Sequence, residues 1–369
     1  MDAGAVTEQS GAMQRHMALG GDEFAPETVY LNSASCGLLP ARSAAALAAA
    51  VAESASHGTM GRDYLGTGAR VRGAFARLMG VPEERVALGS SVAVQSAFVA
   101  GSLPAGSEVL VAEGDFSSLV NPLAARAGCT VRAVPWEALA DAVRPGTALV
   151  AVSAVHALDG RIADLAAVRD AARAHGALTY VDITQAAGWL PLRLADFDYV
   201  ACGAFKWLLC PRGTTFMVFG GERGEPGGPG WPVPAHAGWV AGEDPGESNY
   251  GPVDRPAATA RRYDEPHAHY SYVAAEHSLG LLAELGVNTV HAHNVALAQQ
   301  YRAGLEAAGF TPRAAPGSAI VSTPGLADAE PRLARAGVRV SVRGGLLRVA
   351  FHLYNSTEDV SRALSLLVP

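Results

Sequence analysis

The stretch YVDITQAAGWLPLRLADFDYVACGAFKWLLCPRG, residues 180–213, decides how this chain folds. It predicts a buried strand that ends at Asp182, a short helical segment from Gln185 and a second strand over residues 198–201. A single lysine, Lys206, then follows between apolar neighbours. An amine kept away from water has a lowered pKa and becomes nucleophilic, which is what Schiff-base chemistry needs. The alternative is a surface lysine whose stem lies on apolar residues while its ammonium stays in water.

The set of Asp182, Gln185 and Lys206 resembles the class V aminotransferase and cysteine desulfurase superfamily, fold type I enzymes that use pyridoxal 5'-phosphate (PLP). In that superfamily an Asp-x-x-Gln or Asp-x-x-His follows a strand, and a lysine further along carries the cofactor as an imine. The resemblance extends from about residue 30 to the end of the chain. It implies an α/β fold with a mostly parallel sheet in a large domain and a smaller C-terminal α/β domain.

The same resemblance implies a role for each of these side chains. Asp182 would keep the pyridine nitrogen protonated, so that the ring withdraws electrons from a carbanion at the substrate Cα. Gln185 would donate a hydrogen bond to the phenolic oxygen of the ring. Lys206 would be the catalytic base that moves the Cα proton once substrate has replaced it in the imine.

Composition limits the classes of partner. The chain has 369 residues, 49% of them hydrophobic, and a net charge of −7, so we expect a small-molecule substrate and no nucleic acid. Four cysteines without framework spacing predict a reduced, cytoplasmic protein, and no metal site is expected. The sequence contains no run of 18 apolar residues, so we expect no membrane span. The alanine-rich stretch over residues 41–55 predicts an amphipathic helix.

We predict three segments. Residues 1–28 are a polar, flexible leader without the features of a signal peptide. Residues 29–265 form the large PLP-binding domain, in which strands over 85–88, 108–112 and 148–153 alternate with helices. Residues 266–369 contain long helices and the small C-terminal domain, which can also include part of the N-terminal segment.

Two further segments are candidates for cofactor contacts. In ALGSSVAVQSAFVAG, residues 87–101, a strand runs through Gly-Ser-Ser into a helix, so Ser90 and Ser91 are candidate phosphate ligands. From the residues alone, an ordinary helix N-cap is the alternative. Phe116 lies where relatives place an aromatic or histidine that stacks on the cofactor ring, and the alternative is a core phenylalanine.

The substrate side has its own candidates. Arg348 lies in LRVAFHLYNSTEDV, residues 347–360, and matches the family arginine that holds the substrate α-carboxylate. Ser35 belongs to a small-residue segment, with Ser33 and Ala34, that lines the substrate side in relatives. His156 stands beside the position of a family asparagine, and it either contacts the substrate or is an ordinary loop histidine. Arg343 is either a second basic contact or a surface residue.

The resemblance also implies a homodimer with its site near the interface. The Gly- and Pro-rich residues 220–251 correspond to a region that covers the site and contacts the partner. The family often has a Gly-Thr-Pro near residue 267 that reaches the partner's phosphate. Its absence leaves His267 and Tyr270 as candidates for that role. His267 with His269, and His291 with His293, lack an acidic partner for a metal site.

The segment ahead of Arg348 bears on the reaction type. Cysteine desulfurases carry a catalytic cysteine ahead of the carboxylate-binding arginine, but residues 338–348, VRVSVRGGLLR, contain none, so this is not a typical desulfurase. The motif set resembles accessory members that cleave the C–S bonds of cysteine conjugates, and we expect a C–S β-lyase acting on a cysteine-derived thioether. An aminotransferase and an amino-acid epimerase are the alternatives. A non-catalytic binding protein is disfavoured because the cofactor residues are present.

Overall fold

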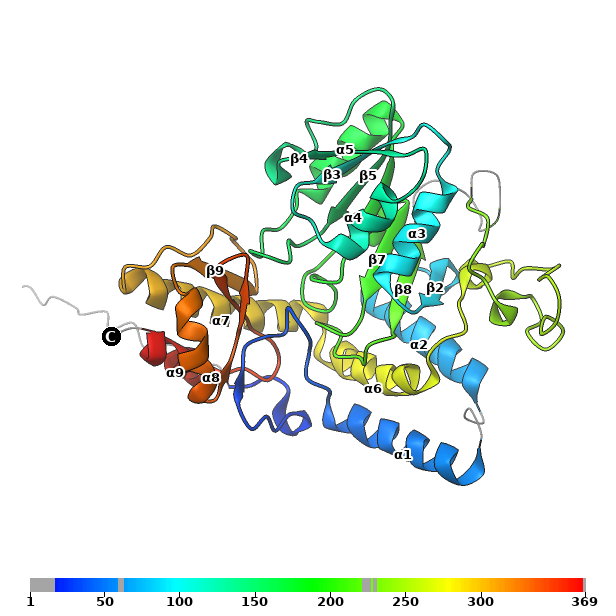
Figure 1. Ribbon diagram of the computed structural model, residues 1–369. Helices are drawn as coiled ribbons and strands as arrows, with labels where there is room; N and C mark the ends of the chain where they lie inside the picture. The colour runs from blue at the N-terminus through cyan, green and yellow to red at the C-terminus, as the bar shows by residue number, and fades with distance from the viewer. Residues whose placement is uncertain (1–16, 59–62, 221–226, 228–230, 368–369) are drawn as a thin grey trace, which may run out of the picture.

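The computed structural model describes residues 17–58, 63–220, 227 and 231–367, so most of the expected leader lies outside the described residues. It folds into a large α/β unit and a smaller C-terminal unit (Figure 1). The main helices are α1 Ala41–His57, α2 Tyr64–Met79, α3 Val92–Ser102, α4 Ser117–Ala124, α5 Leu165–His175, α6 His269–Leu285, α7 Val287–Ala307, α8 Glu330–Arg335 and α9 Thr357–Leu367. The strands are β1 Val29–Tyr30, β2 Val86–Gly89, β3 Glu108–Ala112, β4 Thr130–Val134, β5 Thr147–Ser153, β6 Leu178–Asp182, β7 Tyr199–Gly203, β8 Thr215–Phe219, β9 Ile320–Pro324, β10 Val338–Arg339, β11 Ser341–Arg343 and β12 Leu346–Ala350.

The large unit is built on a seven-stranded sheet in the order β2-β8-β7-β6-β5-β3-β4. Neighbouring strands are parallel except for the two pairs that involve β8. Strands β6, β7 and β8 are buried almost throughout, as expected for strands covered by helices on both faces. The expected α/β fold with a mostly parallel sheet is therefore confirmed.

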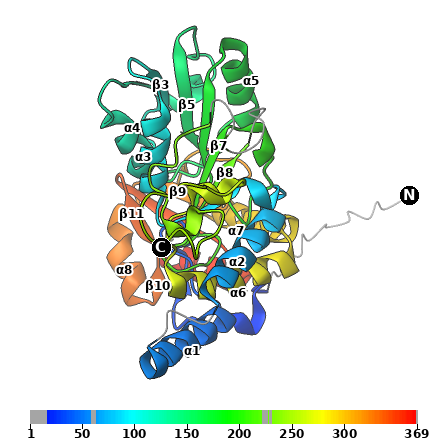
Figure 2. The same cartoon turned by 90° about the vertical axis from the view of Figure 1, so that its right-hand side faces the viewer.

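Alternation along the strands divides the core between the two faces of this sheet. Tyr180 packs in a cluster with Phe98 of α3, whereas its neighbour Val181 packs in a cluster with Phe75 of α2 and Leu279 of α6. Helix α1 lies along α6, beyond the sheet (Figure 2). The apolar residues of the 180–213 stretch thus anchor both layers of helices.

The smaller unit contains the antiparallel sheet β11-β12-β9, covered by α7, α8 and α9. Strand β1 pairs in parallel with β10, so the N-terminal segment joins the C-terminal unit before the chain enters α1. The boundary at residues 265/266 stays a prediction. None of the described helices combines the length and the apolar character needed to cross a membrane.

One local expectation was wrong. The segment that follows β6 forms successive turns over residues 184–189 and not a helix. Gly188 has φ +85°, and a Cβ there would lie 2.9 Å from a Leu208 methyl and 3.2 Å from the Trp207 carbonyl oxygen. Only glycine allows this close packing against the lysine loop, and Pro191 then prevents a helix from continuing.

Candidate active site

The carboxyl ends of β6 and β7 bring together the two residues that the chemistry needs most. Asp182 is the last residue of β6, and Lys206 lies three residues beyond β7. The strands pair in parallel with Asp182 opposite Ala201. Both side chains are buried, with exposed fractions of 4% for Asp182 and 5% for Lys206. Ligands of parallel sheets bind at this edge, so the pair lies where a cofactor is expected.

The Lys206 amine is a desolvated cation on an aromatic surface. Its Nζ lies 5.0 Å from the ring centroid of Phe116 and 5.7 Å from that of Phe205. Burial lowers the pKa of Lys206 to about 8; the charge of Asp182 opposes this change, and those of Arg348 and Arg212 reinforce it. The surface-lysine alternative therefore fails, and a reactive neutral amine is accessible near neutral pH.

The loop that carries Lys206 is tightly constrained. Leu209 adopts a left-handed conformation with φ 59°, and the Ser278 hydroxyl donates to its carbonyl oxygen at 2.8 Å. Gly37 passes so close that a Cβ there would lie 2.1 Å from the Lys206 carbonyl oxygen. Its N–H donates to the Phe205 carbonyl at 3.0 Å. A strained backbone held from both sides fixes the position from which the Lys206 side chain extends.

Asp182 is a buried carboxyl with one backbone donor. The Thr184 N–H donates to its Oδ1 at 2.8 Å. Burial raises the pKa of Asp182, while the hydrogen bonds from Thr184 and the charge of Lys206 act in the opposite direction. Such a group gains most from a cation that is hydrogen-bonded to it, and a protonated pyridine nitrogen is a cation of that kind.

The orientation of the Gln185 amide is fixed by its neighbours. The Trp207 indole N–H, which can only donate, gives a 2.8 Å hydrogen bond to Gln185 Oε1. Nε2 therefore points the other way and donates to the Ala34 carbonyl at 2.9 Å. The second N–H of Nε2 is left for another acceptor. This matches the donor that a phenolic oxygen on the cofactor ring requires.

Phe116 is an exposed platform and not a core residue, since 44% of it is accessible. Asp115 holds the loop beneath it, because the Ser153 hydroxyl and the Phe116 N–H donate to Oδ1 at 2.5 and 2.6 Å. Oδ2 accepts from the Ser153 N–H at 2.8 Å. Ser153 is the last residue of β5 and pairs with Asp182 of β6. The loop that carries Phe116 is therefore bonded to the same end of the sheet as the Asp182 carboxyl.

His156 is buried, and both of its ring nitrogens face acceptors. Nδ1 lies 2.8 Å from Asp159 Oδ1, and Nε2 lies 3.2 Å from the Gly114 carbonyl oxygen. Burial opposes protonation, but the hydrogen bond and charge of Asp159 outweigh it, so the pKa of His156 is raised. The ring bridges two loops, and direct contact with a substrate would require breaking one of these bonds. This geometry favours the loop-histidine alternative.

The Gly-Ser-Ser segment lies between β2 and α3, as expected. Ser91 is the N-cap of α3 and accepts from the Val94 N–H at 3.3 Å, which leaves its hydroxyl hydrogen free. The Ser90 hydroxyl instead donates to Glu265 Oε2 at 2.6 Å. A hydroxyl has a single hydrogen, so Ser90 cannot donate to a phosphate while it donates to Glu265. The Ser90 hydroxyl is thus engaged by Glu265 in this structure, and its role as a phosphate ligand stays a prediction.

Arg348 reaches the site from β12 of the small unit. Its guanidinium is buried and donates to the Ser35 hydroxyl at 2.7 Å, to the Ser341 hydroxyl at 3.3 Å and to the Ala157 carbonyl oxygen. Burial lowers the pKa of Arg348 to about 10, and Arg343 adds to this. No carboxylate among the described residues pairs with it. A buried cation without a counter-ion is a receptor for an anionic group.

Other candidates lie at the margin. Arg343 is exposed and donates to the neighbouring Val342 carbonyl. Ser33 bonds to the Tyr354 hydroxyl at 2.5 Å and so ties the N-terminal segment to the small unit. His267 is buried, with its ring stacked on Tyr64 at 4.0 Å, whereas Tyr270 is 39% exposed. Among the described residues, no group of three side chains could hold a metal ion.

Sequence reasoning missed three residues at the site. Arg212 stacks on Phe205 with 4.1 Å to the ring centroid and contributes to lowering the pKa of Lys206. Cys36 acts on the same pKa in the opposite direction. Glu265 caps Ser90. Arg212 lies on the same loop as the lysine and could have been found by that proximity. Cys36 and Glu265 carry no local signal.

Together these residues fit a flat, anionic, aldehyde-bearing cofactor such as PLP. They offer an amine, a buried carboxyl, an oriented amide donor, an aromatic platform and a helix N-terminus. The feature that does not match is the Glu265 carboxylate beside the place for the phosphate.

Comparisons with known proteins identify a family for this chain. The model of the family described as Aminotransferase class-V matches residues 29–226. An uncharacterized aminotransferase, YcbU, from Bacillus subtilis (strain 168) is 27% identical over 310 residues, covering 79% of this chain and 81% of that protein. Isopenicillin N epimerase from Amycolatopsis lactamdurans is 30% identical over 207 residues, covering 49% of this chain and 51% of that protein.

A solved structure extends the likeness over almost the full length. The cystine C–S lyase C-DES, in complex with its reaction product cysteine persulfide, has a TM-score of 0.81 at 21% identity, covering 93% of this chain and 98% of that chain. Another structure of C-DES, a mutant, holds glycine covalently linked to its PLP cofactor. At this identity the likeness establishes a common fold.

Proposed function

This chain belongs to the class V aminotransferase family, and from that premise we propose that it is a C–S β-lyase acting on a cysteine-derived thioether. The family uses PLP and acts on amino acids. The cofactor, when bound, supplies an electron sink for the substrate Cα. The observation that carries the proposal is the buried Lys206 amine, whose pKa is lowered to about 8, together with Arg348, which has no carboxylate partner among the described residues.

Five residues would hold the cofactor. Lys206 would bind its aldehyde carbon, Asp182 its ring nitrogen and Gln185 its phenolic oxygen. Phe116 would support one face of the ring and exclude water from it. Ser91, with the N-terminus of α3, would receive the phosphate.

Arg348 would orient the substrate. A guanidinium binds a carboxylate through two parallel hydrogen bonds, which fixes the direction of the Cα–H bond relative to the Lys206 amine. The Ser35 contact at 2.7 Å limits how far this guanidinium can turn. Lys206 would then remove the Cα proton, and its pKa of about 8 suits a base that works near neutral pH.

The groups near Lys206 limit which leaving group the site can release from the substrate Cβ. A thiolate departs without strong acid assistance, whereas an alkoxide or amide would need a second proton donor. The imidazole of His156 and the carboxylate of Asp115 are both engaged with protein groups. A site with one free base therefore favours cleavage of a Cβ–S bond.

The hairpin ahead of Arg348 argues against the desulfurase route. Strands β11 and β12 are joined by Gly344 and Gly345, which have φ +52° and +76°. Two residues at positive φ make a tight two-residue turn, and neither is a cysteine. A mobile thiol-bearing loop cannot be accommodated in this connection.

The products that form with and without a keto acid test the proposed reaction. Elimination breaks the Cα–H and Cβ–S bonds and, with one water, gives pyruvate, ammonia and one equivalent of the sulfur leaving group, which is a thiol from an S-alkyl cysteine and cysteine persulfide from cystine. We would incubate the PLP-loaded protein with each substrate without a keto acid and measure pyruvate together with the thiol or the persulfide. Equal formation of both supports the lyase. Turnover only with a keto acid acceptor would replace it with an aminotransferase.

An aminotransferase is the second candidate, favoured by the 27% identity to a relative named as one. It would need the same residues, so only the acceptor requirement separates the two. Epimerisation needs bases on both faces of Cα, and deuterium incorporation with loss of optical purity would reveal it.

We further propose a homodimer in a reduced, cytoplasmic setting. Val233 and Tyr250, in the Gly- and Pro-rich segment, are 78% and 94% exposed, as expected of residues that a partner covers. The four cysteines are free thiols. Sedimentation of the PLP-loaded protein would test the assembly.

A further inference from the structure

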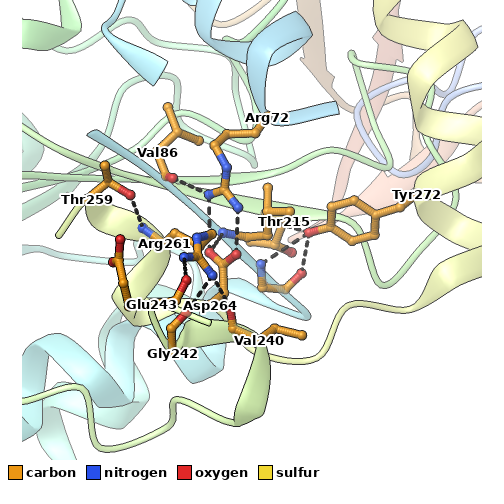
Figure 3. A network of polar contacts seen from close by, with 12 residues as sticks. Arg72, Val86, Thr215, Val240, Gly242, Glu243, Thr259, Arg261, Asp264 and Tyr272 are labelled. Atoms are coloured by element: carbon orange, nitrogen blue, oxygen red, sulfur yellow. Dashed lines mark hydrogen bonds and ion pairs between the residues drawn. The ribbon is translucent and has the colours of Figure 1, made fainter. Parts of the chain in front are cut away.

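A buried ion pair fixes the backbone next to the Gly-Ser-Ser segment. Asp264 forms a 2.6 Å ion pair with Arg72 and accepts from the Leu88 N–H at 2.8 Å, and both charged side chains are buried (Figure 3). Arg72 also donates to the Val86 carbonyl oxygen. Strand β2 and the segment after it are therefore locked to residue 264.

The residue that follows this anchor is aimed at the N-terminus of α3. The Glu265 N–H donates to the Leu88 carbonyl oxygen at 3.2 Å, so its backbone lies beside the end of β2. Its carboxylate accepts from the Ser90 hydroxyl at 2.6 Å and lies 3.4 Å from the Ser90 N–H nitrogen. A Cβ on Gly89 would lie 3.0 Å from Oε1, so the carboxylate occupies the space that a side chain at this glycine would need.

A buried amide beside this carboxylate is incompletely bonded. Gln95, in the first turn of α3, is 5% exposed, and its Oε1 has no hydrogen-bond partner among the described residues. Its Nε2 lies 3.2 Å from the same Cβ position on Gly89. A polar cup is formed by the N-terminus of α3, Ser90, Ser91 and the Gln95 amide. The anion bonded in this cup is the Glu265 carboxylate.

We propose that Glu265 is an intrinsic competitor for the phosphate cup: its carboxylate holds the Ser90 hydroxyl and must leave before Ser90 can bind the phosphate of the cofactor. This inference rests on the proposed cofactor site. Phosphate and carboxylate both need donors and repel each other, so the protein binds the cofactor against the cost of displacing its own anion. Glu265 thereby sets cofactor affinity without contacting the reacting atoms.

Cofactor binding, and not turnover, tests this proposal. We would titrate wild-type protein and E265Q with PLP and with pyridoxal, which lacks the phosphate, following the visible absorbance of the imine at Lys206. E265Q should bind PLP about tenfold more tightly, as expected for removal of one nearby like charge, with pyridoxal affinity unchanged. The inhibition constant of inorganic phosphate against PLP should fall by a similar factor in E265Q.

A matched control separates local from overall charge. Glu284 on α6 pairs with Arg42 at the surface, so E284Q makes the same change in net charge away from the cup and should leave PLP affinity unchanged. Normal pyridoxal binding by E265Q shows that its site is folded. Equal PLP affinities of E265Q and wild type, or an equal gain for pyridoxal, would overturn the inference alone. Failure of the wild type to bind either aldehyde would instead overturn the proposed cofactor site.

Discussion

The indole N–H of Trp207 donates a 2.8 Å hydrogen bond to Oε1 of Gln185, and this contact decides which end of the amide faces the cofactor position. The two residues are adjacent in space because the turn after β6 packs on the lysine loop. The site is thus oriented by the residue that follows the reactive lysine in sequence.

Trp207→Phe should disturb this orientation. The change leaves Gln185 Oε1 buried without a donor, which costs about 1–3 kcal/mol and lets the amide rotate. We expect lower kcat and a shifted absorbance of the bound cofactor. Trp189→Phe is the matched control, because its indole donates to the Gln185 backbone carbonyl at 2.7 Å and does not orient the amide. Equal spectral changes in the two variants would contradict this account.

Lys206 should reduce the stability of the cofactor-free protein at neutral pH. Its pKa falls from 10.5 to about 8, so between these values the unfolded state binds more protons and stability rises with pH. Below pH 8 the full cost, about 3 kcal/mol, is present. Lys206→Met should therefore be more stable than wild type at pH 7, with the difference shrinking as the pH approaches 10.5. Urea unfolding at both pH values measures this, and a difference independent of pH would refute it.

Arg348 should control recognition of the substrate carboxylate. Arg348→Lys keeps the charge but loses the paired hydrogen bonds, so kcat/KM for an amino acid should fall about 100-fold, mainly through KM. Arg343→Gln, at the exposed end of β11, should change it less than about twofold. Steady-state kinetics on both variants provide the test. A larger loss in the Arg343 variant would reassign the carboxylate site.

His156 should stabilise the protein in a pH-dependent manner. Because its folded pKa is raised above 6.5, its contribution is fully present below pH 6.5 and is lost as the pH rises through the folded value. His156→Gln should thus be destabilising at pH 6 and less so at pH 9. Thermal unfolding at the two pH values measures this. His175→Gln, at the exposed end of α5, controls for loss of a histidine, and the same pH trend there would remove the explanation.

Local pattern was enough for the framework. The apolar runs at residues 108–112 and 178–182 became strands because continuous apolar segments bounded by turns have few other ways to leave water. The position of Lys206 between apolar neighbours predicted its burial for the same reason. The turn at residues 184–189 was missed, since a single glycine and its contact with Trp207 overrode a helical pattern.

The sequence by itself predicted a mostly parallel sheet that alternates with helices, because this depends on patterns within short segments, and its resemblance to a family singled out Asp182 and Lys206. Only the tertiary structure decided the rest of the site. Ser90 and Glu265 are 175 residues apart in sequence, and Arg348 and Ser35 are 313 apart. Hydrogen bonds of this kind depend on where the packed core places each backbone, and no local pattern of residues records that.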